Sequence, residues 1–411
     1  MPPAIPPTLY ILGAGSIGLL HACACRISSY PVRLLLRHET FLRLGSANTL
    51  SVSLTSPAFG KTGARTRVFD IPIQDATEYK SGITNDSDNR SNSSSFIRFL
   101  LVTTKANDAA DAISSILHRL PPIQPTVPQS PSSTSLQTLD PSHLPVAITD
   151  VVLMTNGVQA ASEEVAAVLD SANVSTRLRL ATTTHGVHRD DHIDCGRNER
   201  RVIHAGVGRT TFEKRCHSPE QGVRYDAVEV LRDTWNAAKG VTDGRPFIEP
   251  SIIEPSEMVL LQWKKLIVNC AINPLTALRG YRNGNLLLPF PGCGGGGNLV
   301  LDPKAVELAS EAAYVASAVL AHSTPAAEQP AITAEDAVSL VSEIAQSTSS
   351  NISSMLQDVR DCRTTEIQYI NGYVGRVGRC LGLKTPLNDW ACGIVEGLGD
   401  KYQSGGFGRE K

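Results

Sequence analysis

Three polar residues recur at steps of four within an otherwise apolar stretch of the chain. Lys265, Asn269 and Asn273 lie in the segment Trp263–Asn285, most of which has the composition of a buried helix. On a helix, a step of four places these side chains on a single stripe. A buried lysine is costly unless it has partners, so the stripe needs an explanation. Two are open: an internal hydrogen-bond network, or the wall of an active site.

A glycine-rich turn opens the chain and has a different chemistry. The apolar run Leu9–Leu12 suits a buried strand, and an apolar helix is expected from about Leu19 to Ile27. Between them stands a GxGxxG motif, whose residues are Gly13, Ala14, Gly15, Ser16, Ile17 and Gly18. In this context the glycines allow a tight turn, the approach of a pyrophosphate and close packing of helix on strand. The motif therefore predicts a dinucleotide site with phosphates at the helix N-terminus.

Cationic and amide side chains follow other predicted strands of the same sheet. Arg37 ends the strand Val32–Leu36, at the position where NAD enzymes carry an acidic residue. An arginine there suits the 2′-phosphate of NADP. The alternative is that Arg37 is an ordinary surface residue and that Glu39, two residues further on, binds the ribose hydroxyl of NAD. Lys105 and Asn156 also follow predicted strands, where doubly wound sheets bind ligands. A helix-start lysine and an ordinary Asn-Gly turn are the simpler readings of these two residues.

Composition bounds the remaining possibilities. The chain has 411 residues, 41% of them apolar, which is enough for two or three domains. Its net charge of -2 and the lack of a long basic block argue against a nucleic-acid partner. No apolar run reaches the length of a membrane span. Nine cysteines without a CxxC pair indicate reduced thiols, and no targeting peptide is recognisable, so the cytoplasm is favoured over the mitochondrion.

The order of the predicted elements indicates an α/β protein. A Rossmann-type dinucleotide-binding domain is expected over residues 1–250, followed by an all-helical domain over 251–411. Polar insertions are predicted at 81–95 and 120–145, and a flexible glycine-rich loop at 293–297. We further expect a loop from 206 to 225, a strand at Phe247–Ile248, and one helix from about Ser350 to Leu381.

One cluster of potential metal ligands invites a different interpretation. His185, His188, His192 and Cys195 lie close together in the sequence. Their spacing matches no known zinc motif, and a strand end followed by a polar loop explains them better. We therefore predict no metal site.

Longer motifs make the chain resemble the ketopantoate reductase (2-dehydropantoate 2-reductase) family, as a eukaryotic, fungal-like member. The N-terminal matches alone would be a generic Rossmann signal, whereas the two C-terminal ones are long and specific. The matching segments are GAGSIG at 13–18, TTKA at 103–106, TNG at 155–157, TTTHG at 182–186, WKKLIVNCAINPLTAL at 263–278, NGNL at 283–286 and NISSMLQDVRDCRTTEIQYINGY at 351–373.

The resemblance implies a role for each matching residue. It implies NADPH-dependent reduction of ketopantoate to pantoate, a step of pantothenate and coenzyme A biosynthesis, with Lys265 as general acid and Glu366 beside it. It places the substrate against Asn156, Asn269, Asn273, Asn283 and Ser354. It places NADP against Gly13–Gly18, Arg37, Lys105, Asn156, Glu366 and the backbone of Val187. The expected partner is a small 2-keto acid, and the protein would be a monomer or a homodimer.

Two alternatives stay open at this point. One is a related reductase of another 2-keto acid or a keto-lactone, because the motifs define the reaction better than the substrate's side chain. The other is a catalytically inactive NADP-binding regulatory protein on the same fold. The insertions, the glycine-rich loop and Val158-Gln159 after TNG depart from the family's pattern, but none of these departures removes a reacting group.

Overall fold

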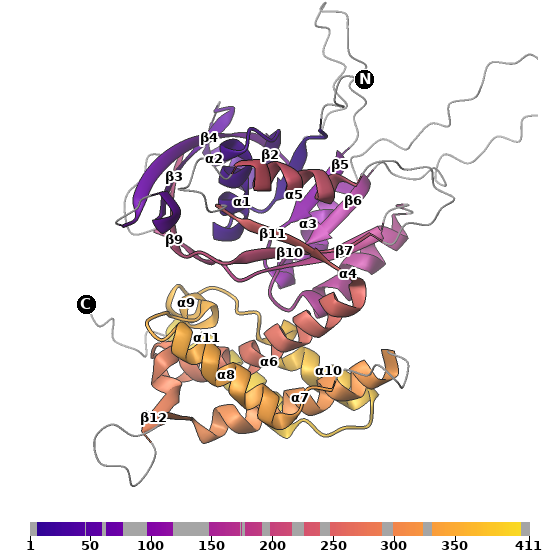
Figure 1. Ribbon diagram of the computed structural model, residues 1–411, viewed down its shortest axis with the longest axis vertical. Coiled ribbons are helices and arrows are strands. Elements are labelled where there is room, and N and C mark those ends of the chain that lie inside the picture. The colour runs from indigo at the N-terminus through magenta and orange to yellow at the C-terminus, as the bar shows by residue number, and fades with distance from the viewer. Residues whose placement is uncertain are drawn as a thin grey trace, which may run out of the picture. The chain divides into compact units, whose positions relative to one another are not determined.

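The computed structural model describes residues 6–45, 47–59, 63–76, 97–117, 148–172, 174, 177–190, 198–215, 226–238, 247–289, 299–323 and 331–403. The predicted insertions at 81–95 and 120–145 and the glycine-rich loop at 293–297 lie outside these residues. The chain divides into two compact units. The first comprises Met1–Thr155 and Ala161–Pro255, and the second comprises Asn156–Ala160 and Ser256–Lys411 (Figure 1).

The first unit is built on an eleven-stranded sheet with the order β11-β10-β7-β6-β5-β1-β2-β4-β3-β9-β8. Its strands are β1 (Leu9–Leu12), β2 (Val32–Leu36), β3 (Thr49–Ser56), β4 (Arg65–Asp75), β5 (Ile97–Val102), β6 (Ile148–Leu153), β7 (Arg177–Thr183), β8 (Gly186–Arg189), β9 (Glu199–Gly206), β10 (Arg209–Glu213) and β11 (Glu249–Ile253). The run from β7 through β1 to β4 is parallel, as a Rossmann-type sheet requires. The helices of this unit are α1 (Ser16–Ile27), α2 (His38–Arg43), α3 (Ala106–Leu117), α4 (Val158–Ser171, whose first residues belong to the second unit) and α5 (Ala227–Ala237), with a 3-10 turn η1 (Pro57–Phe59).

A bent two-stranded ribbon explains why α1 has no polar face. Only Thr184 and His185 separate β7 from β8, and only Val207 and Gly208 separate β9 from β10. β7 pairs with β10, and β8 with β9, at opposite ends of the strand order. The ribbon therefore carries the sheet around α1, which contacts β8 and β9 as well as β1 and β2. Every residue of α1 from Gly18 to Cys25 is consequently buried.

The second unit is helical around one apolar core. Its elements are α6 (Pro255–Arg279), η5 (Asn283–Leu286), β12 (Leu287–Pro289), β13 (Leu299–Leu301), α7 (Pro303–Ser323), α8 (Ala334–Ser347), α9 (Ser354–Arg360), η6 (Ile367–Tyr369), α10 (Asn371–Cys380) and α11 (Pro386–Gln403). The core draws on all of these helices, with Trp263 as its largest side chain. Among the residues that the structure describes, no helix is long and apolar enough to cross a membrane.

Three predictions about these elements were wrong. The helix expected from Ser350 to Leu381 is interrupted: α9 ends where Cys362 adopts a left-handed φ of 53° and Arg363 N–H bonds to the Asp358 carbonyl at 2.8 Å. Part of the loop expected over 206–225 is β10, because its antiparallel partner β7 lies far away in sequence. The last strand of the first unit begins at Glu249, directly after Phe247 and Ile248, which are buried but not part of it.

Candidate active site

The stripe of three polar residues lies on α6, as the period of four predicted. Asn273 is buried with 6% of its surface exposed, while Lys265 and Asn269 are partly buried. Within the described residues, the side-chain amides of Asn269 and Asn273 make no hydrogen bond. An internal network would have consumed these donors and acceptors, since buried polar groups are rarely left unpaired. Both amides are therefore available to a ligand.

Lys265 has a charged neighbour from a segment distant in sequence. Burial lowers the pKa of Lys265 from 10.5 to about 8, and the carboxylate of Glu366 opposes that shift. Glu366 is itself buried, at 6% exposure, and accepts a hydrogen bond from Asn156 Nδ2 at 3.2 Å. An ammonium group with a pKa near neutrality can hold a proton and also release it. The second unit therefore brings together a proton donor, its counter-charge and an amide.

Close backbone packing holds Asn156 in place. The next residue, Gly157, has a φ of 61°, and a Cβ there would stand 2.5 Å from the Tyr369 carbonyl oxygen. Only glycine adopts this conformation and permits this approach without strain. Tyr369 ends the short turn η6 that follows Glu366, so the contact joins the two segments that carry Asn156 and Glu366.

The structure places Asn283 and Ser354 in different environments. Asn283 is 8% exposed; its Nδ2 donates to Thr348 Oγ1 at 3.0 Å, and its Oδ1 is buried without a partner in the described part of the chain. Ser354, in contrast, is exposed at the first position of α9. Its hydroxyl is bonded to no described residue. Ser354 therefore presents a hydroxyl to the surroundings, whereas Asn283 is partly engaged within the protein.

Ser353, which no sequence motif singled out, positions Ser354. Ser353 is the N-cap of α9: its Oγ accepts from Leu356 N–H at 3.2 Å. The same Oγ accepts from Thr276 Oγ1 at 2.7 Å, which ties the start of α9 to α6. Ser-Ser ahead of an apolar run is a capping signal, although the sequence alone does not say which serine caps.

The glycines of the turn between β1 and α1 are needed for different reasons. Gly13 has a φ of 118°, and a Cβ on Gly18 would stand 2.0 Å from the Gly13 carbonyl oxygen and 2.5 Å from Thr103 Oγ1. Both positions are thus required by the fold, and Thr103 Oγ1 secures the turn by donating to the Gly13 carbonyl at 3.0 Å. A Cβ on Gly15 would meet nothing within 4 Å. The open space at Gly15, above the first N–H groups of α1, fits a pyrophosphate.

This difference makes Gly15 a direct test of cofactor binding. Gly15→Ala is expected to leave the melting temperature unchanged, since φ is -73° and no atom is displaced. The added methyl group should raise KM for the reduced dinucleotide by roughly tenfold, by blocking the approach of the pyrophosphate. Steady-state kinetics beside thermal unfolding check both parts. A normal KM would contradict the assignment of the turn to a dinucleotide.

The cations expected near the phosphate end all belong to the first unit. Arg37 follows β2 with 61% of its side chain exposed and pairs with Asp108 on α3, Nη2 to Oδ2 at 2.6 Å. Lys105 is partly buried three residues beyond the end of β5, so both cations stand near carboxyl ends of parallel strands. Val187 lies on the edge strand β8, packed against the core. Glu39 is exposed in the first turn of α2, one residue beyond His38, which pairs with buried Asp75 at 2.6 Å.

The histidines considered as metal ligands have another explanation. His185 Nδ1 lies 2.9 Å from His204 Nε2 and accepts from Gly208 N–H at 3.0 Å, at the bend of the ribbon. Burial lowers the pKa of His185 to about 3 and that of His204 to about 4. His192 and Cys195 lie outside the described residues. Across the ranges that the structure describes, no group of three His, Cys, Asp or Glu side chains could hold a metal ion.

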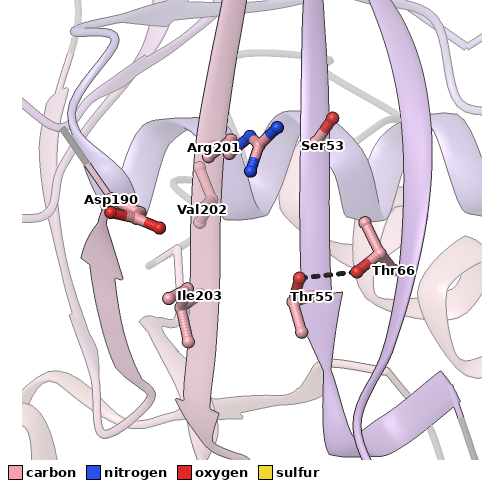
Figure 2. A pocket seen from close by; sticks show the side chains of 7 residues that line it. All are labelled: Ser53, Thr55, Thr66, Asp190, Arg201, Val202 and Ile203. Atoms are coloured by element: carbon pink, nitrogen blue, oxygen red, sulfur yellow. Dashed lines mark hydrogen bonds between the residues drawn. The ribbon is translucent and has the colours of Figure 1, made fainter. Parts of the chain in front are cut away.

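A pocket in the first unit is lined by none of the predicted site residues. Side chains of β3, β4 and β9 line it together with Asp190. Figure 2 shows the hydrogen bond between Thr55 and Thr66, with Arg201 near Ser53 and Asp190 apart from that pair. Its volume is about 230 Å³, below the roughly 300–1,000 Å³ of most ligand pockets. None of the predicted site residues lines it, so it adds nothing to the candidate site.

Comparison with known proteins places both units in one family. The family described as "Ketopantoate reductase PanE/ApbA" matches residues 9–215, and "Ketopantoate reductase PanE/ApbA C terminal" matches residues 257–399. The 2-dehydropantoate 2-reductase of Shigella flexneri is 28% identical over 267 residues, covering 65% of this chain and 71% of that protein. The enzyme of the same name from Vibrio cholerae is 33% identical over 212 residues, covering 51% of this chain and 56% of that protein.

The fold agrees with a solved structure. The crystal structure of a probable 2-dehydropantoate 2-reductase from Bacillus subtilis aligns with a TM-score of 0.58 and 20% identity, covering 95% of this chain and 99% of that one. The α/β fold class, with a Rossmann-like unit followed by helices, is thereby confirmed. The first family match alone spans half of the sequence. The chain therefore belongs to the ketopantoate reductase PanE/ApbA family.

Proposed function

We propose that this protein reduces the 2-keto group of ketopantoate to the alcohol of pantoate, with NADPH as hydride donor and Lys265 as proton donor. Family membership supports this oxidoreductase activity. The observation that carries the residue assignment is the stripe on α6. It presents a lysine with a pKa of about 8 beside two amides that no described residue engages.

The chemistry requires a hydride, a proton and an anchor for the carboxylate. The nicotinamide cofactor supplies the hydride when it is bound. As negative charge develops on the carbonyl oxygen, the Lys265 ammonium stabilises it and then donates a proton, which completes the alcohol. Asn269, Asn273, Asn283 and Ser354 can bind the carboxylate and hydroxyl groups without adding charge, so they orient the substrate.

Glu366 and Asn156 support the proton donor in this proposal. The carboxylate raises the pKa of Lys265 against the effect of burial, so the ammonium form persists near neutral pH. Asn156 donates to the same carboxylate and thereby orients it. The pair serves to keep Lys265 charged until the substrate arrives.

The first unit is proposed as the NADP-binding domain and the second as the substrate domain. The phosphates would be held by the N–H groups after Gly15, and the 2′-phosphate by Arg37 with Lys105 nearby. The family resemblance also assigns cofactor contacts to the backbone of Val187 and to Asn156 and Glu366. Arg37 pairs with Asp108, but 61% of its side chain is exposed, so a second anion can reach it.

The proposed function predicts a specific substrate spectrum. Purified protein is expected to oxidise NADPH with ketopantoate, and with a higher kcat/KM than with a panel of other 2-keto acids and a keto-lactone. Loss of absorbance at the NADPH band measures each rate. Preference for another keto acid would assign a different substrate to the same machinery. No oxidation with any of them would favour a cofactor-binding regulatory protein.

A further inference from the structure

A proline interrupts the hydrogen-bond ladder of α6 immediately after Asn273. Pro274 has no N–H, so the carbonyl oxygen of Cys270, four residues earlier, loses its helical donor. Cys270 and Pro274 are both buried, so solvent does not replace the missing bond. A buried carbonyl without a hydrogen-bond partner destabilises the folded protein. Some other group must therefore donate to Cys270 if α6 is to continue unchanged.

Asn371 supplies that donor from the first position of α10. Its Nδ2 donates to the Cys270 carbonyl at 3.0 Å and to Asn388 Oδ1 at 2.9 Å. Asn388 Nδ2 in turn donates to Glu311 Oε1 at 2.7 Å. Asn371 is completely buried, and its own Oδ1 finds no partner among the described residues. Within the described residues, the Asn371 side chain therefore makes two hydrogen bonds, both as a donor.

The position of Asn371 along the chain gives this bond a further consequence. Only the short turn η6 separates Glu366 from α10, where Asn371 is the first residue. On the other side of the bond, Lys265 precedes Cys270 on α6 by about one and a half turns. The bond therefore fastens the segment that carries Glu366 to the helix that carries Lys265, close to both charges.

We propose that Asn371 is a positioning residue for proton transfer: by bonding to the carbonyl that Pro274 leaves unpaired, it holds Glu366 at its working distance from Lys265. Asn371 touches neither substrate nor cofactor in this role. The inference rests on the proposed function, because it assumes that Lys265 delivers the proton.

Replacing Asn371 should change Lys265 itself. In Asn371→Ala, the Glu366 segment loses its attachment to α6, and the carboxylate supports the ammonium less. The pKa of Lys265 is expected to fall by about one pH unit, and kcat at neutral pH by roughly 10- to 100-fold. KM for NADPH should change little compared with kcat, because the proposed phosphate contacts are all in the first unit. The pKa is read from the pH dependence of competitive acetylation at Lys265, resolved from exposed Lys264 by tandem mass spectrometry.

Two further variants separate positioning from stability. Val374→Ala removes a buried side chain one turn along α10, so it should lower the melting temperature and leave the pKa of Lys265 unchanged. Pro274→Ala combined with Asn371→Ala restores an N–H donor for Cys270 from within α6. That double variant should regain stability relative to Asn371→Ala, while the pKa of Lys265 stays low, because the helix bond does not hold Glu366.

The outcomes are decisive in both directions. The proposal is overturned if Asn371→Ala leaves the pKa of Lys265 unchanged, if Val374→Ala shifts it equally, or if the double variant restores it. Any of these results would show that Asn371 only satisfies the Cys270 carbonyl and does not position Glu366. Labelling needs no substrate, so an inactive wild-type protein would refute the proposed function while the labelling still tests the geometry.

Discussion

Lys265→Ala is expected to lower kcat by roughly 10²–10⁴-fold, the range that a general acid contributes. The ammonium both stabilises the developing alkoxide and donates to it, and no other titratable cation is assigned to that task. Binding of NADPH, followed by its fluorescence, should be nearly unchanged, since the predicted phosphate contacts come from the first unit. Lys265→Arg should also be slow, because a guanidinium keeps its charge but gives up its proton poorly.

The pH profile of the wild-type protein belongs to the same prediction. Burial lowers the pKa of Lys265 to about 8, so kcat/KM should fall as the pH rises through that value and the ammonium is lost. Glu366 raises this pKa, so Glu366→Gln should move the alkaline limb to lower pH. The residual activity of Lys265→Ala should not show this fall of kcat/KM at alkaline pH.

Lys264 provides the matched control for both measurements. It is the exposed neighbour on the same helix, and Lys264→Ala should leave kcat and the pH profile as they are. A near-normal kcat in Lys265→Ala, or an alkaline limb that survives in it, would show that another group donates the proton.

Arg37→Ala is expected to lower the preference for NADPH over NADH by roughly 10- to 100-fold. A charge-assisted hydrogen bond contributes about 1.5–3 kcal/mol, and each 1.4 kcal/mol is a factor of ten. The whole effect should lie in KM for NADPH, because NADH has no 2′-phosphate for the guanidinium to bind. Initial rates with both dinucleotides at saturating ketopantoate measure it.

Two variants define what this result means. Arg43→Ala removes another exposed arginine of α2 and should change neither KM. Asp108→Asn removes the present partner of Arg37 and should leave the preference for NADPH intact, because the ion pair is exposed and weak. If Arg37→Ala weakened both cofactors equally, Arg37 would have a structural role, and Glu39 would return as the ribose-binding residue.

What the sequence could predict was local to single elements. The strand-turn-helix at Gly13–Gly18 and the stripe of Lys265, Asn269 and Asn273 depend on spacings within a few turns of chain. Both features can therefore be recognised from the sequence alone. The turn follows from the steric requirement for glycine at positions 13 and 18, and the stripe follows from the helical period of α6. The same holds for β2, whose predicted position agrees with the structure.

Apart from the pairing of Lys265 with Glu366, which the family resemblance implied, only the tertiary structure decided which distant groups meet. The residues at 209–213 do not by themselves predict strand β10, because this strand forms by pairing with β7, which is distant in the sequence. Likewise, the Asn371 bond to Cys270 and the Asn156 bond to Glu366 each join segments a hundred or more residues apart. Sequence period alone placed Lys265 on a polar stripe. The lowered pKa of Lys265, its contact with Glu366 and the Asn371 hydrogen bond that joins their segments all depend on packing between residues far apart in the sequence.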